Sequence, residues 1–184
     1  MSEEMLTALE EVNANAYRLI DSVGESQWSS PTPCTEWTVR ELVNHMTGTT
    51  KFIGASASRS EPDSPPDADH VGDDPAAAFL AASKVTAAAW RTEGALDGMV
   101  SIPAEMPAIA SLGVNIIDIG THCWDLARAL DVDHGLSAET IALIDQWNRQ
   151  VITDDVRSGG GFGQALDSDG DALTTMLAFV GRRV

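Results

Sequence analysis

Residues 107–130 read PAIASLGVNIIDIGTHCWDLARAL, and this stretch decides the fold. At about 100° per residue its apolar side chains fall on one face, which predicts an amphipathic helix with a core-facing stripe. The members of this stripe are Leu112, Ile116, Ile119, Cys123, Leu126, Ala127 and Leu130. At ~1.5 Å per residue, the predicted helix is roughly 35 Å long.

Three polar residues lie together along one flank of the same predicted helix. Asn115, Asp118 and His122 follow one another at spacings of three and four, so their side chains stand one above another on the helix surface. A carboxylate and an imidazole placed in this way can reach one point in space. Polar groups at the edge of a core need partners, and a metal ion is one such partner.

Composition narrows the classes of partner. The 184-residue chain has a formal net charge of −17, which would repel the phosphates of nucleic acid. It has no basic cluster for an anionic membrane surface and no apolar run near the ~20 residues that span a bilayer. The first four residues, MSEE, include two glutamates and lack a signal-peptide pattern, so the cytoplasm is the expected location.

Helical periodicity extends over most of the remaining chain. It predicts further helices over residues 3–22, 38–53, 76–91, 137–152 and 171–181. Thr38 and Glu41 fit a capping box at the start of the second helix, and Asp74-Pro75 supplies an N-cap and a first-turn proline for the third.

Three stretches interrupt the helical pattern. Residues 56–74 and 158–163 are predicted to be loops, and residues 99–102 a short strand or an extended link. The expected architecture is all-α, a bundle of four principal helices with accessory short helices. Residues 1–184 are expected to form a single domain.

The candidate metal ligands are His45, Asp118 and His122. His45 lies on the flank of the second helix, so two imidazoles and one carboxylate on facing helices would supply three ligands and leave coordination positions open. Zinc binds such sets, and iron, nickel or manganese also fits them. An open position matters because a metal-bound water or thiol loses its proton more easily. The alternative is a simple hydrogen bond between Asp118 and His122, with His45 as a half-buried structural histidine.

The two cysteines, Cys34 and Cys123, are too few for a disulfide scaffold and are expected to be free thiols. Cys123 lies on the core stripe and is predicted to pack as a small apolar residue. Cys34 precedes the second helix, whose dipole favours a thiolate, although a packing role in the turn is preferred over a nucleophile. No G-x-S-x-G motif is present, which disfavours a serine hydrolase.

The remaining polar and aromatic candidates are predicted to have structural or solvated roles. Asp125 and Arg128 are expected on a solvated helix face, and His70 and His134 in solvated loops. Three tryptophans are expected to be core or packing residues rather than a ligand-stacking set: Trp37, Trp124 and Trp147.

Two segments resemble the signatures of a known family. Residues 31–45, PTPCTEWTVRELVNH, and residues 118–129, DIGTHCWDLARA, resemble those of the mycothiol-dependent maleylpyruvate isomerase-like family in the DinB-like superfamily. Residues 161–163 with residues 177–182 resemble the end of its short, single-domain actinobacterial members. The resemblance implies a DinB-like four-helix bundle and a divalent metal, usually zinc. It also implies that the ligands are a histidine on the second helix and an acidic-x-x-x-His pair on a later one, positions that His45, Asp118 and His122 match.

This chain departs from the isomerase in two ways. The isomerase has glutamate where this chain has Asp118, which is one methylene shorter. Asp118 is therefore predicted to ligate directly, to act through water, or to orient His122. The isomerase also carries an additional C-terminal domain that helps to form its substrate pocket, so maleylpyruvate itself is not the expected substrate.

The leading functional hypothesis is a metal-dependent, thiol-utilising transferase or isomerase. The metal would hold a low-molecular-weight thiol such as mycothiol as its thiolate, which would attack a small electrophile. The alternatives are a non-catalytic binding or assembly module with a structural metal, and a metal-dependent hydrolase. The electrophile, the thiol, the native metal and the existence of a homodimer stay open.

Overall fold

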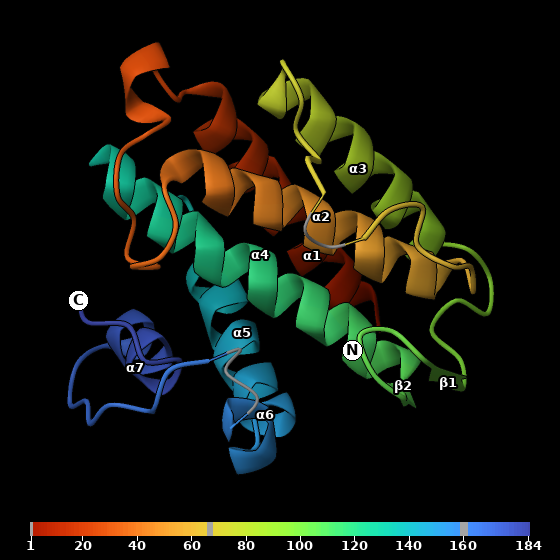
Figure 1. Ribbon diagram of the computed structural model, residues 1–184. Helices are drawn as coiled ribbons and strands as arrows, with labels where there is room; N and C mark the ends of the chain where they lie inside the picture. The colour runs from red at the N-terminus through yellow and green to blue at the C-terminus, as the bar shows by residue number, and fades with distance from the viewer. Residues whose placement is uncertain (1, 66–67, 159–161) are drawn as a thin grey trace.

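Four long helices pack around one apolar core: α1 (Ser2–Asp21), α2 (Val39–Ala57), α3 (Pro75–Trp90) and α4 (Ala108–Leu130). Both α1 and α2 contact α3 and α4, so the order around the bundle is α1–α4–α2–α3. In Figure 1, α2 and α4 cross the centre of the molecule with α1 behind them. The computed structural model describes residues 2–65, 68–158 and 162–184. The predicted all-α four-helix bundle is confirmed.

Shorter elements are attached to this bundle. They are η1 (Glu25–Gln27), β1 (Met99–Val100), β2 (Met106–Pro107), α5 (Ala138–Val151), α6 (Asp154–Ser158) and α7 (Ala172–Phe179). The strands β1 and β2 form a short antiparallel ladder next to the start of α4. α5 packs on α4 and α1, and α7 packs on α5. The structure describes only part of each of the two predicted loops, because residues 66–67 and 159–161 lie outside the described ranges.

Side-chain caps fix where the helices begin. The Thr38 hydroxyl accepts a hydrogen bond from the Glu41 backbone N–H, and the Glu41 carboxylate accepts one from the Thr38 backbone N–H at 2.7 Å. This is the predicted capping box at the start of α2. The Asp74 carboxylate caps α3 directly before Pro75. Because its cap fixes the start of α2, the place of His45 on that helix is also fixed.

Two glycines allow α5 to approach α4 closely. A Cβ atom at Gly113 would lie 2.7 Å from the Trp147 ring, and one at Gly120 would collide with Ile144. A side chain at either position would therefore require the facing side chain of α5 to shift. The close approach seats α5 against α4, so the end of α5 lies beside the outer flank of α4.

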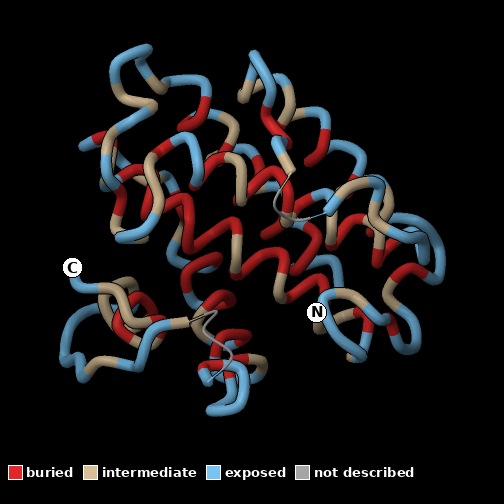
Figure 2. The backbone as a smooth tube through the Cα atoms, in the orientation of Figure 1, coloured by how far each residue is buried: buried red, intermediate tan, exposed pale blue. Residues whose placement is uncertain are grey.

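The core lies between the four principal helices. Figure 2 shows buried residues concentrated along the inner faces of the bundle and exposed residues in the loops. Every residue of the predicted stripe on α4 is buried, from Leu112 at 0% exposure to Leu130 at 8%. Within the described ranges, no helix combines the length and apolar character needed to cross a membrane.

The prediction for His70 is wrong. His70 is buried, and its ring packs so closely on Gly48 of α2 that a Cβ atom there would lie 2.6 Å from it. The Asn44 side chain accepts a hydrogen bond from the His70 backbone N–H at 2.7 Å. The polar composition of this loop gave no indication of these contacts, because the residues that make them belong to α2 and not to the loop itself. His134 is half-buried rather than fully solvated.

Candidate metal centre

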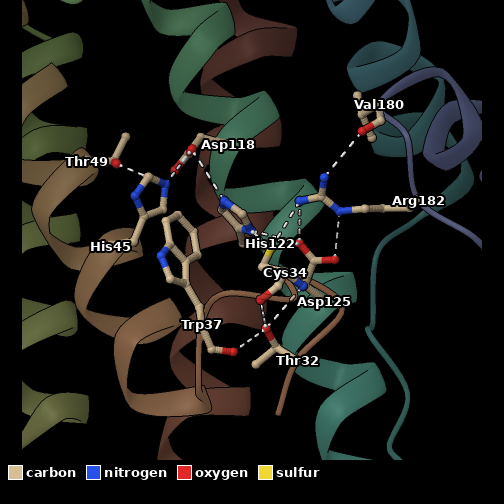
Figure 3. A network of polar contacts seen from close by, with 10 residues as sticks. All are labelled: Thr32, Cys34, Trp37, His45, Thr49, Asp118, His122, Asp125, Val180 and Arg182. Atoms are coloured by element: carbon tan, nitrogen blue, oxygen red, sulfur yellow. Dashed lines mark hydrogen bonds and ion pairs between the residues drawn. The ribbon is translucent and has the colours of Figure 1, made fainter. Parts of the chain in front are cut away.

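The structure brings the three predicted ligands together on two neighbouring helices. His45 comes from α2, and Asp118 and His122 lie one turn apart on α4. The His45 Nε2 atom is 3.0 Å from Asp118 Oδ1, and His122 Nε2 is 3.7 Å from the same oxygen. One ligand atom from each residue lies within 4.8 Å of the other two. Figure 3 shows the two imidazoles turned toward the Asp118 carboxylate.

The second oxygen of Asp118 indicates what the cluster lacks. Asp118 Oδ2 is buried and accepts no hydrogen bond from any residue in the described part of the chain. A buried carboxylate oxygen without a partner is costly. A divalent cation held between this carboxylate and the two imidazoles would remove that cost, and these are donor types that zinc accepts. The residues present therefore fit a metal ion, and that they bind one stays a prediction.

Without a metal, His45 and Asp118 each shift the other's pKa in the direction that favours an ion pair, so the pKa of His45 rises and that of Asp118 falls. Burial lowers the pKa of His45, but the Asp118 charge and hydrogen bond outweigh burial and raise that pKa above 6.5. Burial likewise raises the pKa of Asp118, while the two imidazoles outweigh it and lower that pKa. The carboxylate is thus ionised and ready to bind a cation.

We expect the His45 ring protons of metal-free protein, followed by NMR, to titrate above the ordinary value. The His45–Asp118 pair then contributes its full stabilisation at pH values below ~6.5, the pKa of His45 in the unfolded chain. This stabilisation is lost as pH rises through the raised pKa of His45 in the folded protein. Metal binding needs the neutral ring, so metal affinity should increase with pH over the same range. In Asp118→Asn, burial acts without the charge and the pKa should fall. An unchanged titration in this variant would show that Asp118 does not cause the shift.

A second carboxylate stands behind His122. Asp125 Oδ2 lies 2.8 Å from His122 Nδ1, which leaves Nε2 on the side of Asp118. The predicted solvated position of Asp125 is wrong, since its exposure is 0%, whereas Arg128 is exposed as predicted. Arg182 covers Asp125 and donates to both of its oxygens, at 3.0 and 2.9 Å. An imidazole held through its other nitrogen keeps one orientation, as metal-binding histidines usually do.

Cys34 belongs to the same network. Its Sγ atom lies 3.2 Å from Asp125 Oδ2 and 3.2 Å from Arg182 Nη2. Burial and the neighbouring Asp125 charge raise the pKa of Cys34 to about 12, so the thiolate expected from the helix dipole is not favoured. Cys34, His122 and Asp125 also form a group of metal-ligand type. Because Arg182 already donates hydrogen bonds to both oxygens of Asp125, this second group needs no metal ion to balance its buried carboxylate. The predicted burial of Cys123 is confirmed.

The His45–Asp118–His122 cluster opens into a cavity of about 860 Å³. Trp37 forms part of its wall, with its ring centroid 4.5 Å from that of His45 and 5.9 Å from that of His122. Trp37 is half-buried and packs against the core, as predicted, and its ring also lies against His45. The predicted core positions of Trp124 and Trp147 are confirmed. A cavity of this size falls within the ~300–1,000 Å³ typical of small-molecule sites.

Comparison with known proteins identifies the family. Residues 9–127, more than half of the chain, match the mycothiol maleylpyruvate isomerase N-terminal domain. The chain belongs to this family. Two uncharacterized proteins from different strains of Mycobacterium tuberculosis are each 33% identical over 130 residues, which cover 67% of this chain and 68% of each relative. No solved structure matches the chain.

Membership of the mycothiol maleylpyruvate isomerase N-terminal domain family confirms the resemblance of residues 31–45 and 118–129. It makes this a mycothiol-related, metal-binding domain of DinB-like fold. The family match includes all three candidate ligands but ends before α5, α6 and Arg182. The outer partner of Asp125 and one wall of the cavity therefore come from chain beyond the match.

Proposed function

We propose that this protein binds one divalent metal ion, preferably zinc, through His45, Asp118 and His122, and uses it to activate a low-molecular-weight thiol of mycothiol type. Nickel, iron or manganese is the alternative metal. The observation that carries the proposal is that two imidazoles converge on Oδ1 of the Asp118 carboxylate, whose other oxygen has no partner among the described residues, beside a cavity of about 860 Å³. When bound, the metal supplies Lewis acidity that lowers the pKa of a thiol.

The side chains of the site have separate tasks in this chemistry. Asp118 contributes a negative charge, and the two neutral imidazoles supply nitrogen donors. Asp125 accepts a hydrogen bond from the Nδ1–H of His122 and so holds the other ring nitrogen toward the cavity. Trp37 shields one side of His45 from water and leaves the other side open to the cavity.

The reaction class follows from a thiolate placed beside an electrophilic carbon. The thiol loses its proton, and its sulfur forms a C–S bond. If the carbon belongs to an alkene, rotation and loss of the sulfur gives isomerisation. If a leaving group departs with the bonding electron pair, the product is a thioether and the reaction is a transfer. A reduced thiol as co-substrate agrees with the predicted cytoplasmic location.

The test combines elemental analysis with a thiol-conjugation assay over a panel of electrophiles. We expect about one divalent metal ion per chain and turnover that requires added thiol. Dialysis against a chelator should reduce turnover to the uncatalysed rate, and zinc should restore it. Turnover of esters or amides without thiol would identify a metal-dependent hydrolase instead. Bound metal without turnover of any kind would favour the non-catalytic module.

A further inference from the structure

The cavity wall that faces away from the ligands is apolar. It is built from side chains of α2, β2, α4, α5, α6 and the segment after residue 161. Representative members are Phe52, Met106, Val114, Val151, Val156 and Phe162. Burying apolar surface against such a wall is favourable, whereas an ion there would lose its hydration without a partner.

Cationic side chains are almost absent from this wall. Among the described residues that line the cavity, Arg182 is the one lysine or arginine. Its Nε and Nη2 atoms donate to the Asp125 carboxylate, and Nη1 donates to the Val180 carbonyl at 3.3 Å. Asp125 is fully buried and matches the Arg182 charge. Arg182 is therefore engaged, and it offers no free charge to a carboxylate or phosphate.

Apart from the His45–Asp118 pair, whose charges offset each other, the charge that remains in the lining is acidic. Glu36 lines the cavity, and the chain as a whole carries a net charge of −17. An anionic ligand would approach through a negative potential and then find no counter-charge on the apolar wall. The attraction for an anion therefore lies at the end of the cavity that holds His45 and His122, where the metal and the thiol are proposed to bind, and not at the apolar wall.

We propose that the electrophile is a neutral molecule with a largely apolar body, such as an aromatic or α,β-unsaturated ester, and not a dicarboxylate. This inference rests on the proposed function, because that function is what makes the ligand of the cavity an electrophile. The apolar wall binds its body, and the reactive carbon faces the cluster of His45, Asp118 and His122. The cavity volume accommodates such a molecule together with the sulfur end of a thiol.

The test is a pair of ligands, methyl cinnamate and cinnamate, that share the aromatic alkene and differ at one end by the charge and one methyl group. Their affinities are measured by isothermal titration calorimetry on metal-free protein without thiol, so that neither metal charge nor turnover contributes. We expect the ester to bind roughly tenfold or more tightly than the carboxylate, because the buried carboxylate has no partner. Binding of cinnamate as tightly as the ester, or binding of neither ligand, overturns the proposal.

Two lysine variants show whether the ligand lies in this cavity. Val156 lines the cavity and is 41% exposed, so Val156→Lys adds a cation without burying it. It should reduce the preference for the ester several-fold by improving cinnamate binding. Val85→Lys adds the same charge on α3, at a side chain that is 70% exposed and does not line the cavity, and should leave the ratio unchanged. Equal shifts in both variants would place the ligand elsewhere.

The calorimetric test of the ligand class and the assays of the proposed function can fail separately. If the calorimetry gives the expected preference but the metal and thiol assays fail, the neutral-ligand site stands and the catalytic proposal falls. If thiol-dependent turnover is found while cinnamate binds as well as its ester, the proposed function stands and the substrate class is wrong.

Discussion

Replacing His122 by alanine is expected to abolish metal binding and thiol-dependent turnover while leaving the protein folded. His122 supplies one of three proposed ligands, so metal affinity should fall by more than the roughly 10–100-fold that loss of an outer partner costs. The substitution also removes one hydrogen bond to the Asp125 carboxylate, which lowers the free energy of unfolding by roughly 2 kcal/mol. The measurements are metal content, turnover and the melting temperature.

The comparison that decides the meaning of this variant is metal-free wild type. If the metal serves catalysis, metal-free wild type and His122→Ala should both be folded and inactive, and the variant should melt only the few degrees lower that loss of its hydrogen bond to Asp125 costs. If the metal is structural, both should lose most of their stability, because metal binding is then part of the folding free energy. His134→Ala is the matched control, since His134 lies in the turn after α4 and away from the cluster. Full metal content in His122→Ala would refute the assignment of this ligand.

Replacing Asp125 by alanine is expected to cost the most stability of any single change at the site. It leaves the Arg182 guanidinium, which is 16% exposed, without its carboxylate and leaves His122 Nδ1 without its acceptor. Removing one partner of a buried ion pair lowers the free energy of unfolding by roughly 3–5 kcal/mol. Metal affinity should also fall roughly 10–100-fold, because His122 is no longer held in one orientation. Urea unfolding and metal titration measure the two effects.

The control is the double variant Asp125→Ala with Arg182→Leu, which removes both charges. It should recover part of the lost stability, since no unpaired charge remains, but not the lost metal affinity, which depends on His122. Stability of Asp125→Ala within 1 kcal/mol of wild type, an amount expected of an ordinary surface position, would contradict this account.

The same carboxylate predicts a dependence of stability on pH. Burial alone would raise the pKa of Asp125, but hydrogen bonds from His122 and Arg182 hold it well below its usual range. Its contribution is therefore fully present above the unfolded pKa of ~3.9 and is lost as pH falls from there toward the folded value. Asp125→Asn should show a flatter dependence between about pH 5 and pH 2 than wild type.

Local patterns in the sequence explain how much of the centre could be predicted. The helical period brings Asp118 and His122 to one flank of α4, and the capping box fixes the start of α2 and thereby the place of His45. These are short-range relations, so periodicity and capping signals detect them. The interhelical contact between His45 and Asp118 was expected from facing helices and from the family resemblance.

The residues that the sequence did not reveal depend on long-range packing. Arg182 reaches Asp125 across 57 positions of the chain, and no periodic signal links the two. The spacing of three between His122 and Asp125 was a usable signal, because a carboxylate one turn after a candidate ligand is a frequent outer partner. The cavity wall from α5 and α6 was not predictable in the same way, since it depends on how closely α5 seats on Gly113 and Gly120 of α4.

The apolar wall of the cavity has a mixed origin along the chain. The proposed metal ligands lie inside the family match together with Phe52, Met106 and Val114 of the wall, whereas Val151, Val156 and Phe162 come from the segment beyond residue 127. On the proposed function, substitutions in that later segment would change which electrophile is accepted and leave the proposed metal ligands in place. For protein engineering, these three positions are the natural starting set for changing the ligand of the cavity, since none of them is a proposed metal ligand.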